Sequence, residues 1–353
     1  MRLADLDTPV PVVDLDRVEA NLVRMQAYCD EHGLKLRPHI KTHKLPEIAR
    51  RQIELGAVGI TCQKISEALV FAEAGCEDIL LTYPIVGPTK IAPLAELARK
   101  TRRLSVALDN AVALDTVAAA AAEAGREIGV LIEFDSGDGR CGVQSVDEAM
   151  VLARRAAGNG AVVFRGLMTY PRGPKTASFV AEAKQALAAA GIPLEVVSVG
   201  GTPGCWSTHD VEGATELRVG TYVYQDRATV AAGVASLDEV AFHVIVTVVS
   251  MPTPDRVVID SGTKTLSSDR VPASAGEGYG LVLEYPKAVV YRLNEEHGVI
   301  DFSAAEGRPA IGGHLTIVPN HVCVVSNLHD RVVCVRGGEV VGERVVAARG
   351  RTV

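Results

Sequence analysis

The chain has 353 residues, a formal net charge of -7 and a sequence pI near 5.8. This length accommodates a (β/α) barrel of about 250 residues and a smaller second unit, and the 48% of hydrophobic residues supply a large core. The acidic balance argues against nucleic acid as a partner, because phosphate binding needs a basic face. Neither a secretory leader nor an apolar run of about 18 residues is visible, which predicts a cytoplasmic protein with no membrane partner.

The seven cysteines are an odd number and are scattered without Cys-x-x-Cys spacing. This usage predicts reduced thiols rather than a disulfide framework. Most of them are expected to be small core residues, and Cys323 is the exception considered below.

Helical and extended patterns alternate through the first two thirds of the chain. Val10–Asp14 reads as a short strand, and Asp16 caps a helix with apolar residues at helical spacing. Eight apolar strands follow, at 34–40, 57–62, 78–84, 103–109, 127–135, 164–170, 195–200 and 217–224. Helical patterns lie between them at 45–55, 64–74, 89–101, 111–124, 146–158 and 175–190. A doubly wound open sheet gives the same alternation with fewer units, so the eight strands favour an α/β fold of the (β/α)₈ barrel type.

Beyond about residue 233 the chain is rich in β patterns and almost without helix. The predicted strands are 240–250, 256–260, 279–283, 287–292, 314–318, 322–325, 332–336 and 339–346. Gly, Pro, Asn and Asp punctuate them, which is typical of an antiparallel arrangement. We therefore expect a barrel domain over residues 15–232 and a mainly antiparallel β-domain over 233–353, joined by residues 1–14, which have no partner in the barrel count.

The basic segment 37–44, Arg-Pro-His-Ile-Lys-Thr-His-Lys, ends the first barrel strand. Leu34, Leu36 and Ile40 share one face of an extended strand, so the basic residues between them and Lys41 share the other. A lysine at a strand end can be fixed by its backbone, desolvated and lowered in pKa, as an imine-forming amine must be. Taken alone, the segment is equally compatible with a solvated edge or an anion patch.

Glycines follow the seventh and eighth barrel strands, in S-V-G-G-T-P-G at 198–204 and R-V-G-T-Y at 218–222. Glycine lets backbone N–H groups approach a dianion closely, and Thr202 adds a hydroxyl donor. A single glycine loop is more often only a turn. Both segments fall where barrels hold phosphate, however, and this coincidence favours a phosphate site.

Two further segments are candidates for a site. The fifth strand ends in a glycine-rich loop at 133–142, which directs Arg140 inward as a partner for a carboxylate or phenolate, unless the loop is a solvated turn. His321 and Cys323 lie two residues apart, and on a strand both would point to the same side and could bind a cation such as zinc. A core histidine beside a core cysteine is the commoner arrangement, and an acid or water would have to complete a metal site.

Together, R-P-H-x-K-T-H-K, G-G-T-P, R-x-G-T-Y and P-N-H-V-C resemble the D-threonine aldolase and D-serine dehydratase branch of the fold-type III pyridoxal-phosphate enzymes, relatives of alanine racemase. The resemblance covers nearly the whole chain. It implies that Lys41 forms the covalent imine with pyridoxal 5'-phosphate, and that Arg140 meets the phenolic oxygen or the substrate carboxylate. Phosphate-holding and neighbouring cofactor residues would be Gly200, Gly201, Thr202, Gly220, Thr221 and Tyr222. Arg218 would face the pyridine nitrogen, and His321 and Cys323 would hold the divalent metal, zinc or manganese, that positions the substrate's β-hydroxyl.

The activity that this resemblance implies is a retro-aldol cleavage of D-threonine-type amino acids to glycine and an aldehyde. A β-elimination that converts D-serine to a 2-oxo acid and ammonia, or an aldolase acting on 3-hydroxy-D-aspartate, would use the same site. A racemase is disfavoured because racemization needs no metal pair, and a non-catalytic cofactor carrier is disfavoured by the appended β-domain. The resemblance also implies a head-to-tail homodimer.

The sequence departs from the family after the sixth strand. Several aldolases of the family place a histidine after the tyrosine there, as a base for the β-hydroxyl, whereas this chain has Tyr170-Pro171-Arg172. A metal-bound water, His39 or His209 could accept the proton instead. Arg172 or Lys175 could meet a second substrate carboxylate, as in 3-hydroxyaspartate.

Overall fold

The computed structural model describes residues 3–271 and 276–353, and the chain divides into two compact units. The barrel unit comprises Met25–Lys41, Pro46–Gly220 and Arg351–Val353. The β-unit comprises the chain up to Arg24, Thr42–Leu45 and Thr221–Gly350. The domain boundary at residues 232 and 233 stays a prediction of the sequence.

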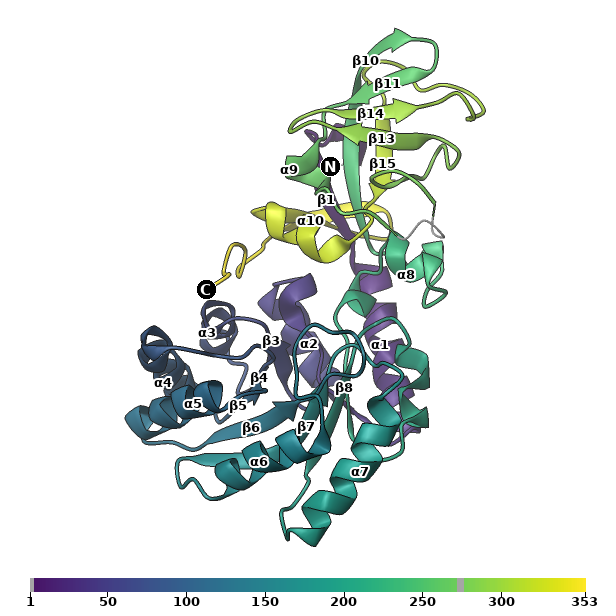
Figure 1. Ribbon diagram of the computed structural model, residues 1–353. Helices are drawn as coiled ribbons and strands as arrows, with labels where there is room; N and C mark the ends of the chain where they lie inside the picture. The colour runs from purple at the N-terminus through teal and green to yellow at the C-terminus, as the bar shows by residue number, and fades with distance from the viewer. Residues whose placement is uncertain (1–2, 272–275) are drawn as a thin grey trace. The chain divides into compact units, whose positions relative to one another are not determined.

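Eight parallel strands form the barrel unit, as the sequence predicts (Figure 1). They are hydrogen-bonded in the order β2-β9-β8-β7-β6-β5-β4-β3, and a parallel bridge between His39 and Thr61 joins the two ends of this series. The strands are β2 (Lys35–Leu36), β3 (Ile60–Cys62), β4 (Asp78–Leu81), β5 (Arg103–Leu108), β6 (Ile128–Glu133), β7 (Val162–Thr169), β8 (Val196–Gly200) and β9 (Glu216–Arg218).

Among the described residues, one helix precedes the first barrel strand and six others follow strands, at the predicted places. They are α1 (Leu15–Glu31), α2 (Pro46–Leu55), α3 (Ile65–Glu73), α4 (Ile91–Lys100), α5 (Ala111–Ala124), α6 (Val146–Ala157) and α7 (Thr176–Ala189). Their ends are encoded locally: Asn110 and Ser145 accept the N3 backbone N–H of α5 and α6, and Gly125 ends α5 in the left-handed conformation. Leu80, Ala107, Leu131 and Met168, from four adjacent strands, pack into one cluster.

The first barrel strand is shorter than predicted. It ends at Leu36, and Lys41 lies in a 3-10 turn, η2 (Ile40–Thr42), instead of at a strand end. The predicted alternation holds through His39, because the backbone N–H groups of Lys35, Arg37 and His39 donate in turn to the carbonyl oxygens of Thr215, Leu217 and Val219. Of these three side chains only that of Lys35 is exposed. Pro38 has no N–H to give to a ladder, and the chain regains a single bridge only at His39. The eighth predicted strand is likewise cut short, since Thr221–Val223 form another 3-10 turn, η5.

The β-unit contains a nine-stranded sheet in the order β11-β14-β13-β12-β15-β10-β1-β16-β17. Strand β10 also pairs with β11, so the six strands from β11 to β10 close into an antiparallel barrel. The N-terminal strand β1 pairs with β10 and β16, which confirms its predicted place in this sheet. The strands are β1 (Val10–Asp14), β10 (Phe242–Thr253), β11 (Arg256–Ile259), β12 (Leu281–Val282), β13 (Val289–Leu293), β14 (Gly298–Asp301), β15 (His314–Val318), β16 (Arg331–Arg336) and β17 (Glu339–Val345).

Three short helices lie in the described part of the β-unit, two of them beyond residue 233, where the sequence predicts almost no helix. They are α8 (Arg227–Ala231), α9 (Thr263–Leu266) and α10 (Val322–Leu328). Residues 322–325 were expected to be a strand because they are rich in valine, and this prediction is wrong. Val322, Val325 and Ser326 are buried at the i, i+3 and i+4 spacing of one helix face, so tertiary burial overrides the preference of valine for strands. The sequence also misses β14.

The remaining short 3-10 turns are η1 (Leu3–Asp5), η3 (Pro88–Lys90), η4 (Cys205–Asp210) and η6 (Leu237–Glu239). Over residues 3–271 and 276–353, none of the helices has the length and apolar character needed to cross a membrane.

Candidate functional site

Lys41 lies at the carboxyl-terminal end of the barrel strands, where barrel active sites are found. Its Nζ is 5.7 Å from the centroid of the Tyr170 ring, and Tyr170 directly follows β7. The Arg140 guanidinium lies over the same ring, with its Cζ 4.7 Å from the centroid. The fold therefore brings together, through one tyrosine, the lysine and the arginine that the sequence singles out 99 positions apart.

His39 supports the turn that carries Lys41. Its Nε2 is 3.0 Å from Gln63 Oε1, and its Nδ1 accepts the backbone N–H of Lys41 at 3.3 Å. A ring nitrogen that accepts a hydrogen bond carries the lone pair, so this arrangement places the proton on Nε2, which donates to Gln63. The geometry makes His39 a support for the Lys41 backbone and leaves neither nitrogen open to serve as a base.

Arg140 is held by a buried acid that the sequence analysis missed. Its Nη2 donates to Glu133 Oε1 at 3.1 Å, and the Cys141 thiol lies 3.3 Å from the same oxygen. Glu133 ends the otherwise apolar strand β6. An isolated acid in such a strand is the sequence signal that could have identified it as a partner of Arg140. The Oε2 atom of Glu133 is buried and has no hydrogen-bond partner among the described residues.

The loop that bears Arg140 is ordered by Asp135. One carboxylate oxygen accepts the backbone N–H groups of Gly137, Asp138 and Gly139, and these bonds lower the pKa of Asp135. Beside this loop lies a cavity of about 320 Å³. It is lined by Gln63, Thr82, Tyr83, Pro84, Arg140 and Cys141. A space of this size beside an arginine suits a small carboxylate-bearing molecule.

The loop after β8 has the features of a phosphate cradle. Gly201 has a φ of +111°, and a Cβ there would lie 3.5 Å from the Tyr170 ring. Thr202 is 3% exposed, and its Oγ1 has no hydrogen-bond partner among the described residues. A buried hydroxyl without a partner is costly, and an oxygen-rich ligand such as phosphate would satisfy it. These residues therefore fit the phosphate of pyridoxal phosphate.

Arg218 ends β9 and is almost completely buried. Its Nε donates to Ser198 Oγ at 2.8 Å, and its Nη2 donates to the carbonyl oxygen of Thr169. Burial lowers the pKa of Arg218 to about 10. Gly220 closes this segment of the barrel unit, while Thr221 and the buried Tyr222 lie in η5 of the β-unit.

His321 and Cys323 are neighbours in the β-unit, although not on a strand. His321 precedes α10 and Cys323 lies in the first turn of that helix. The Thr42 hydroxyl is 3.1 Å from the Cys323 sulfur, and the Thr221 hydroxyl is 3.8 Å from it. In the sequence, Thr42 directly follows Lys41.

Asp226 is a hydrogen-bond partner of His321, and the sequence analysis missed it. Its Oδ2 is 3.1 Å from His321 Nδ1 and also accepts the backbone N–H of Val322. The pKa of His321 is raised to about 11, chiefly by its hydrogen bond to Asp226 and secondly by its hydrogen bond to Cys323. A carboxylate on Nδ1 directs Nε2 outward, as in carboxylate–histidine–metal triads, so the donor set fits a borderline cation.

The protein supplies only part of such a metal shell. Over residues 3–271 and 276–353, no group of three or more His, Cys, Asp or Glu side chains is placed to hold a metal ion. Zinc in catalytic sites keeps positions for water or substrate. A cation held by His321 and Cys323 would therefore depend on ligands from solvent or substrate.

Two other candidate residues have different partners. His209 Nδ1 is 2.8 Å from the Tyr28 hydroxyl, and its ring stacks on His32 with 3.8 Å between centroids. The Arg172 side chain donates to the carbonyl oxygen of Ser207, and its backbone N–H donates to Gly200 at 3.0 Å. Arg172 thus supports the glycine loop, whereas Lys175 is exposed.

Comparison with known proteins identifies the family of both parts of the chain. Residues 13–228 match the family model of the alanine racemase N-terminal domain, and residues 241–335 match that of a putative serine dehydratase domain. D-threonine aldolase of Arthrobacter sp is 40% identical over 99% of this chain and 94% of its own. D-threo-3-hydroxyaspartate dehydratase of Delftia sp. (strain HT23) is 35% identical over 91% of this chain and 92% of its own.

The crystal structure of D-threonine aldolase from Filomicrobium marinum superposes with a TM-score of 0.90 at 32% identity, covering 100% of this chain and 98% of the other. The matched fold thus includes both the parallel barrel and the antiparallel second barrel. The chain belongs to the alanine racemase N-terminal domain family of fold-type III pyridoxal-phosphate enzymes, in the branch that carries a serine dehydratase-type second domain.

Proposed function

We propose that this protein is a pyridoxal-phosphate- and divalent-metal-dependent aldolase that cleaves D-β-hydroxy-α-amino acids of the D-threonine type to glycine and an aldehyde. The observation that carries the proposal is the convergence of Lys41 and Arg140 on Tyr170, beside the loop with the unpartnered Thr202 hydroxyl. The 40% identity to a D-threonine aldolase over almost the whole chain supports the choice of reaction.

Each barrel residue has a distinct task in this proposal. Lys41 holds the cofactor covalently, Thr202 and the glycine N–H groups bind its phosphate, and Arg218 faces its pyridine nitrogen. Arg140, fixed by Glu133, binds the phenolic oxygen or the substrate carboxylate as a bidentate donor. When bound, the cofactor supplies an electron sink for the bond that breaks at Cα.

His321 Nε2 and Cys323 Sγ would hold the divalent cation, zinc or manganese, whose Lewis acidity would serve the β-hydroxyl of the substrate. Asp226 orients the imidazole, and Thr42 and Thr221 support the sulfur. The carboxylate of the D-configured substrate would be bound by Arg140. The retro-aldol outcome requires the proton of that β-hydroxyl to leave while the Cα–Cβ bond breaks.

Dehydration is the second candidate reaction, favoured by the 35% identity to D-threo-3-hydroxyaspartate dehydratase of Delftia. It needs the same carboxylate and β-oxygen contacts, but the Cα proton leaves and the hydroxyl is expelled. Neither the His321 and Cys323 pair nor the Arg140 loop distinguishes the two outcomes, because both reactions require them.

Product analysis separates the candidates. The purified protein with pyridoxal phosphate and zinc or manganese would be incubated in turn with D-threonine, D-serine and 3-hydroxy-D-aspartate. The proposal predicts acetaldehyde and glycine from D-threonine, with turnover abolished by EDTA and restored by adding metal. Pyruvate from D-serine, or oxaloacetate from 3-hydroxy-D-aspartate, without any aldehyde would replace the aldolase by a dehydratase.

We further propose that the protein acts on these small D-amino acids as a cytoplasmic homodimer, following the family resemblance. Analytical ultracentrifugation of the loaded protein at several concentrations measures the assembly directly. A single sedimenting species of one chain mass at high protein concentration would contradict the dimer.

A further inference from the structure

Arg218 is the start of a hydrogen-bonded series that runs among the barrel strands. Arg218 Nε donates to Ser198 Oγ at 2.8 Å, and Ser198 in turn donates to Glu216 Oε1 at 2.6 Å. Ser198 is 0% exposed and Glu216 and Arg218 are each 4% exposed. A single hydroxyl thus links a buried guanidinium to a buried carboxylate on the same strand, β9.

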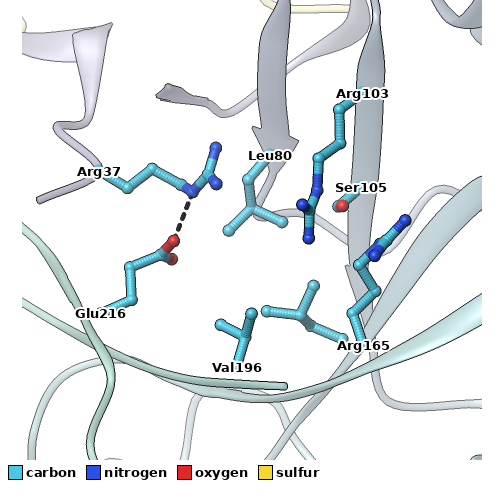
Figure 2. Close-up of a pocket in the computed structure, with 8 residues that line it drawn as sticks. Arg37, Leu80, Arg103, Ser105, Arg165, Val196 and Glu216 are labelled. Atoms are coloured by element: carbon cyan, nitrogen blue, oxygen red, sulfur yellow. Dashed lines mark hydrogen bonds and ion pairs between the residues drawn. The ribbon is translucent and has the colours of Figure 1, made fainter. Parts of the chain in front are cut away.

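The series continues from Glu216 to a second buried arginine (Figure 2). Arg37 Nε donates to Glu216 Oε2 at 2.7 Å, and Arg37 Nη1 donates to Asp78 Oδ1 at 2.7 Å. Figure 2 shows this pair on one side of a pocket whose other wall carries Arg103 and Arg165. The pocket measures about 10 Å³, room for roughly one water molecule, so the series ends in a packed interior and not in a ligand site.

The charges of Arg37, Glu216 and Arg218 explain why Ser198 and Glu216 matter for Arg218. A desolvated guanidinium is stable only with a carboxylate and full hydrogen bonding. Glu216 serves Arg37 directly and Arg218 through Ser198, so one buried acid supports two buried cations. With Nε on Ser198 and Nη2 on Thr169, two of the three guanidinium nitrogens are held by protein groups. The third nitrogen of the Arg218 guanidinium, Nη1, is left to donate to a ligand, as far as the described residues are concerned.

We propose that Ser198 and Glu216 are positioning residues for Arg218: they fix the rotation and the charge of its guanidinium so that Nη1 faces the pyridine nitrogen of the cofactor. This inference rests on the proposed function, because it assumes that pyridoxal phosphate binds beside Lys41. Without the link through Ser198, the guanidinium loses the partner of its Nε and can rotate away. The pyridine nitrogen would then meet a different donor, which changes the electronic state of the bound cofactor.

Ser198→Ala tests the link without breaking the Arg37–Glu216 ion pair. We expect the variant to fold and to bind pyridoxal phosphate, but with a shifted absorption band and a shifted pH at which that band changes. The kcat should fall roughly 10- to 100-fold, as small misplacements of catalytic groups do, with a smaller change in KM. The absorption of the loaded protein without substrate is the decisive readout, because it does not require turnover.

Asp78→Asn is the matched control, because it removes the other carboxylate of Arg37 and leaves the Arg218–Ser198–Glu216 link in place. We expect this variant to lower the melting temperature while the cofactor absorption keeps its wild-type maximum and pH dependence. If the hydrogen-bonded series had only a structural role, Ser198→Ala and Asp78→Asn would both lower stability and both would leave the cofactor absorption unchanged.

Glu216→Gln provides a second variant, since it retains the shape of the side chain and removes its charge. The inference is overturned if the wild type binds pyridoxal phosphate while Ser198→Ala keeps both the absorption maximum and its pH dependence. Failure of the proposed function is distinguishable from this outcome, because in that case the wild type itself would show no cofactor absorption.

Discussion

The Thr202 hydroxyl is buried beside a glycine with positive φ and has no hydrogen-bond partner among the described residues. Such an arrangement costs about 1–3 kcal/mol unless a ligand satisfies it. Thr202→Val keeps the side-chain shape and removes the hydroxyl. We expect the dissociation constant of pyridoxal phosphate to rise at least about tenfold, while the cofactor-free protein melts no lower than the wild type. Equilibrium dialysis and thermal melts measure the two quantities.

Thr101→Val is the control for this prediction. Thr101 is also buried, but its hydroxyl donates to the carbonyl oxygen of Leu97. The same substitution there should lower stability by about 1 kcal/mol and leave cofactor affinity unchanged. Equal cofactor affinity for Thr202→Val and the wild type would show that the Thr202 hydroxyl does not bind the cofactor phosphate.

Asp226 contacts Nδ1 of His321, one of the two proposed metal ligands, and also caps α8. Asn caps helices about as well as Asp, so Asp226→Asn should leave α8 intact. We expect zinc or manganese affinity to fall about 10- to 100-fold, as it does when the outer partner of a metal-binding histidine is lost. Competition with a chelating dye gives the affinity, and Asp238→Asn on the surface is the control. Undiminished affinity would show that Asp226 does not orient a metal ligand.

At the scale of the elements, the register of β7 depends on Gly166. The pairing of β6 with β7 shifts between Phe164 and Gly166, and a Cβ at Gly166 would lie 1.8 Å from the carbonyl oxygen of Val196 in β8. No side chain fits there, so Gly166→Ala should destabilise the protein by about 3 kcal/mol or more. At Gly160 an added Cβ would have no described heavy atom within 4 Å apart from those of the adjacent residues, so Gly160→Ala should change stability little. Urea denaturation of both variants checks the difference.

Strand and helix order in the barrel unit was predictable because each element carries its own local signals. Asn110 and Gly125 bracket α5 at the predicted ends, and apolar strands such as β5 and β6 stand between polar turns. Prediction failed where local preference and tertiary burial disagree. The valines of α10 favour a strand in isolation, but their helical spacing buries one face in the β-unit.

For the candidate site, motif spacing singled out the groups proposed to bind ligands and missed the residues that hold those groups in place. Lys41 and Arg140 stand in conspicuous motifs, whereas Glu133 and Ser198 sit within apolar strands where sequence alone gives them no partner. Asp226 is 95 positions from His321, so its contact depends on the folded chain. Supporting contacts of this kind are set by topology and cannot be derived from local spacing.

At the scale of the whole molecule, stability should depend on pH through His243 in β10. Burial lowers the pKa of His243 from 6.5 to about 4. Between these values the unfolded chain binds a proton that the folded chain excludes, so the stability present above pH 6.5 is lost as the pH falls toward 4. The loss attributable to this group is about 3 kcal/mol at most. His243→Phe should remove that part of the dependence.

The measurement is the free energy of unfolding of the wild type and His243→Phe across this pH range. Their difference isolates His243 from the other titrating groups. A difference that stays constant between pH 6.5 and 4 would mean that the folded protein protonates His243 as readily as the unfolded chain.

The chain passes from the barrel unit to the β-unit between Lys41 and Thr42. Lys41 ends one segment of the barrel unit, and Thr42 begins a four-residue segment of the β-unit in which its hydroxyl contacts Cys323. The peptide bond between these two residues thus connects the proposed cofactor lysine to a residue that contacts one of the proposed metal ligands.

Chemical trapping identifies the lysine that holds the cofactor. The protein would be loaded with pyridoxal phosphate, reduced with borohydride, digested and analysed by mass spectrometry. We expect one pyridoxyl-phosphate group per chain, on the peptide that contains Lys41, and none in Lys41→Ala. A label on another lysine, or no label on the wild-type protein, would contradict the assignment of Lys41.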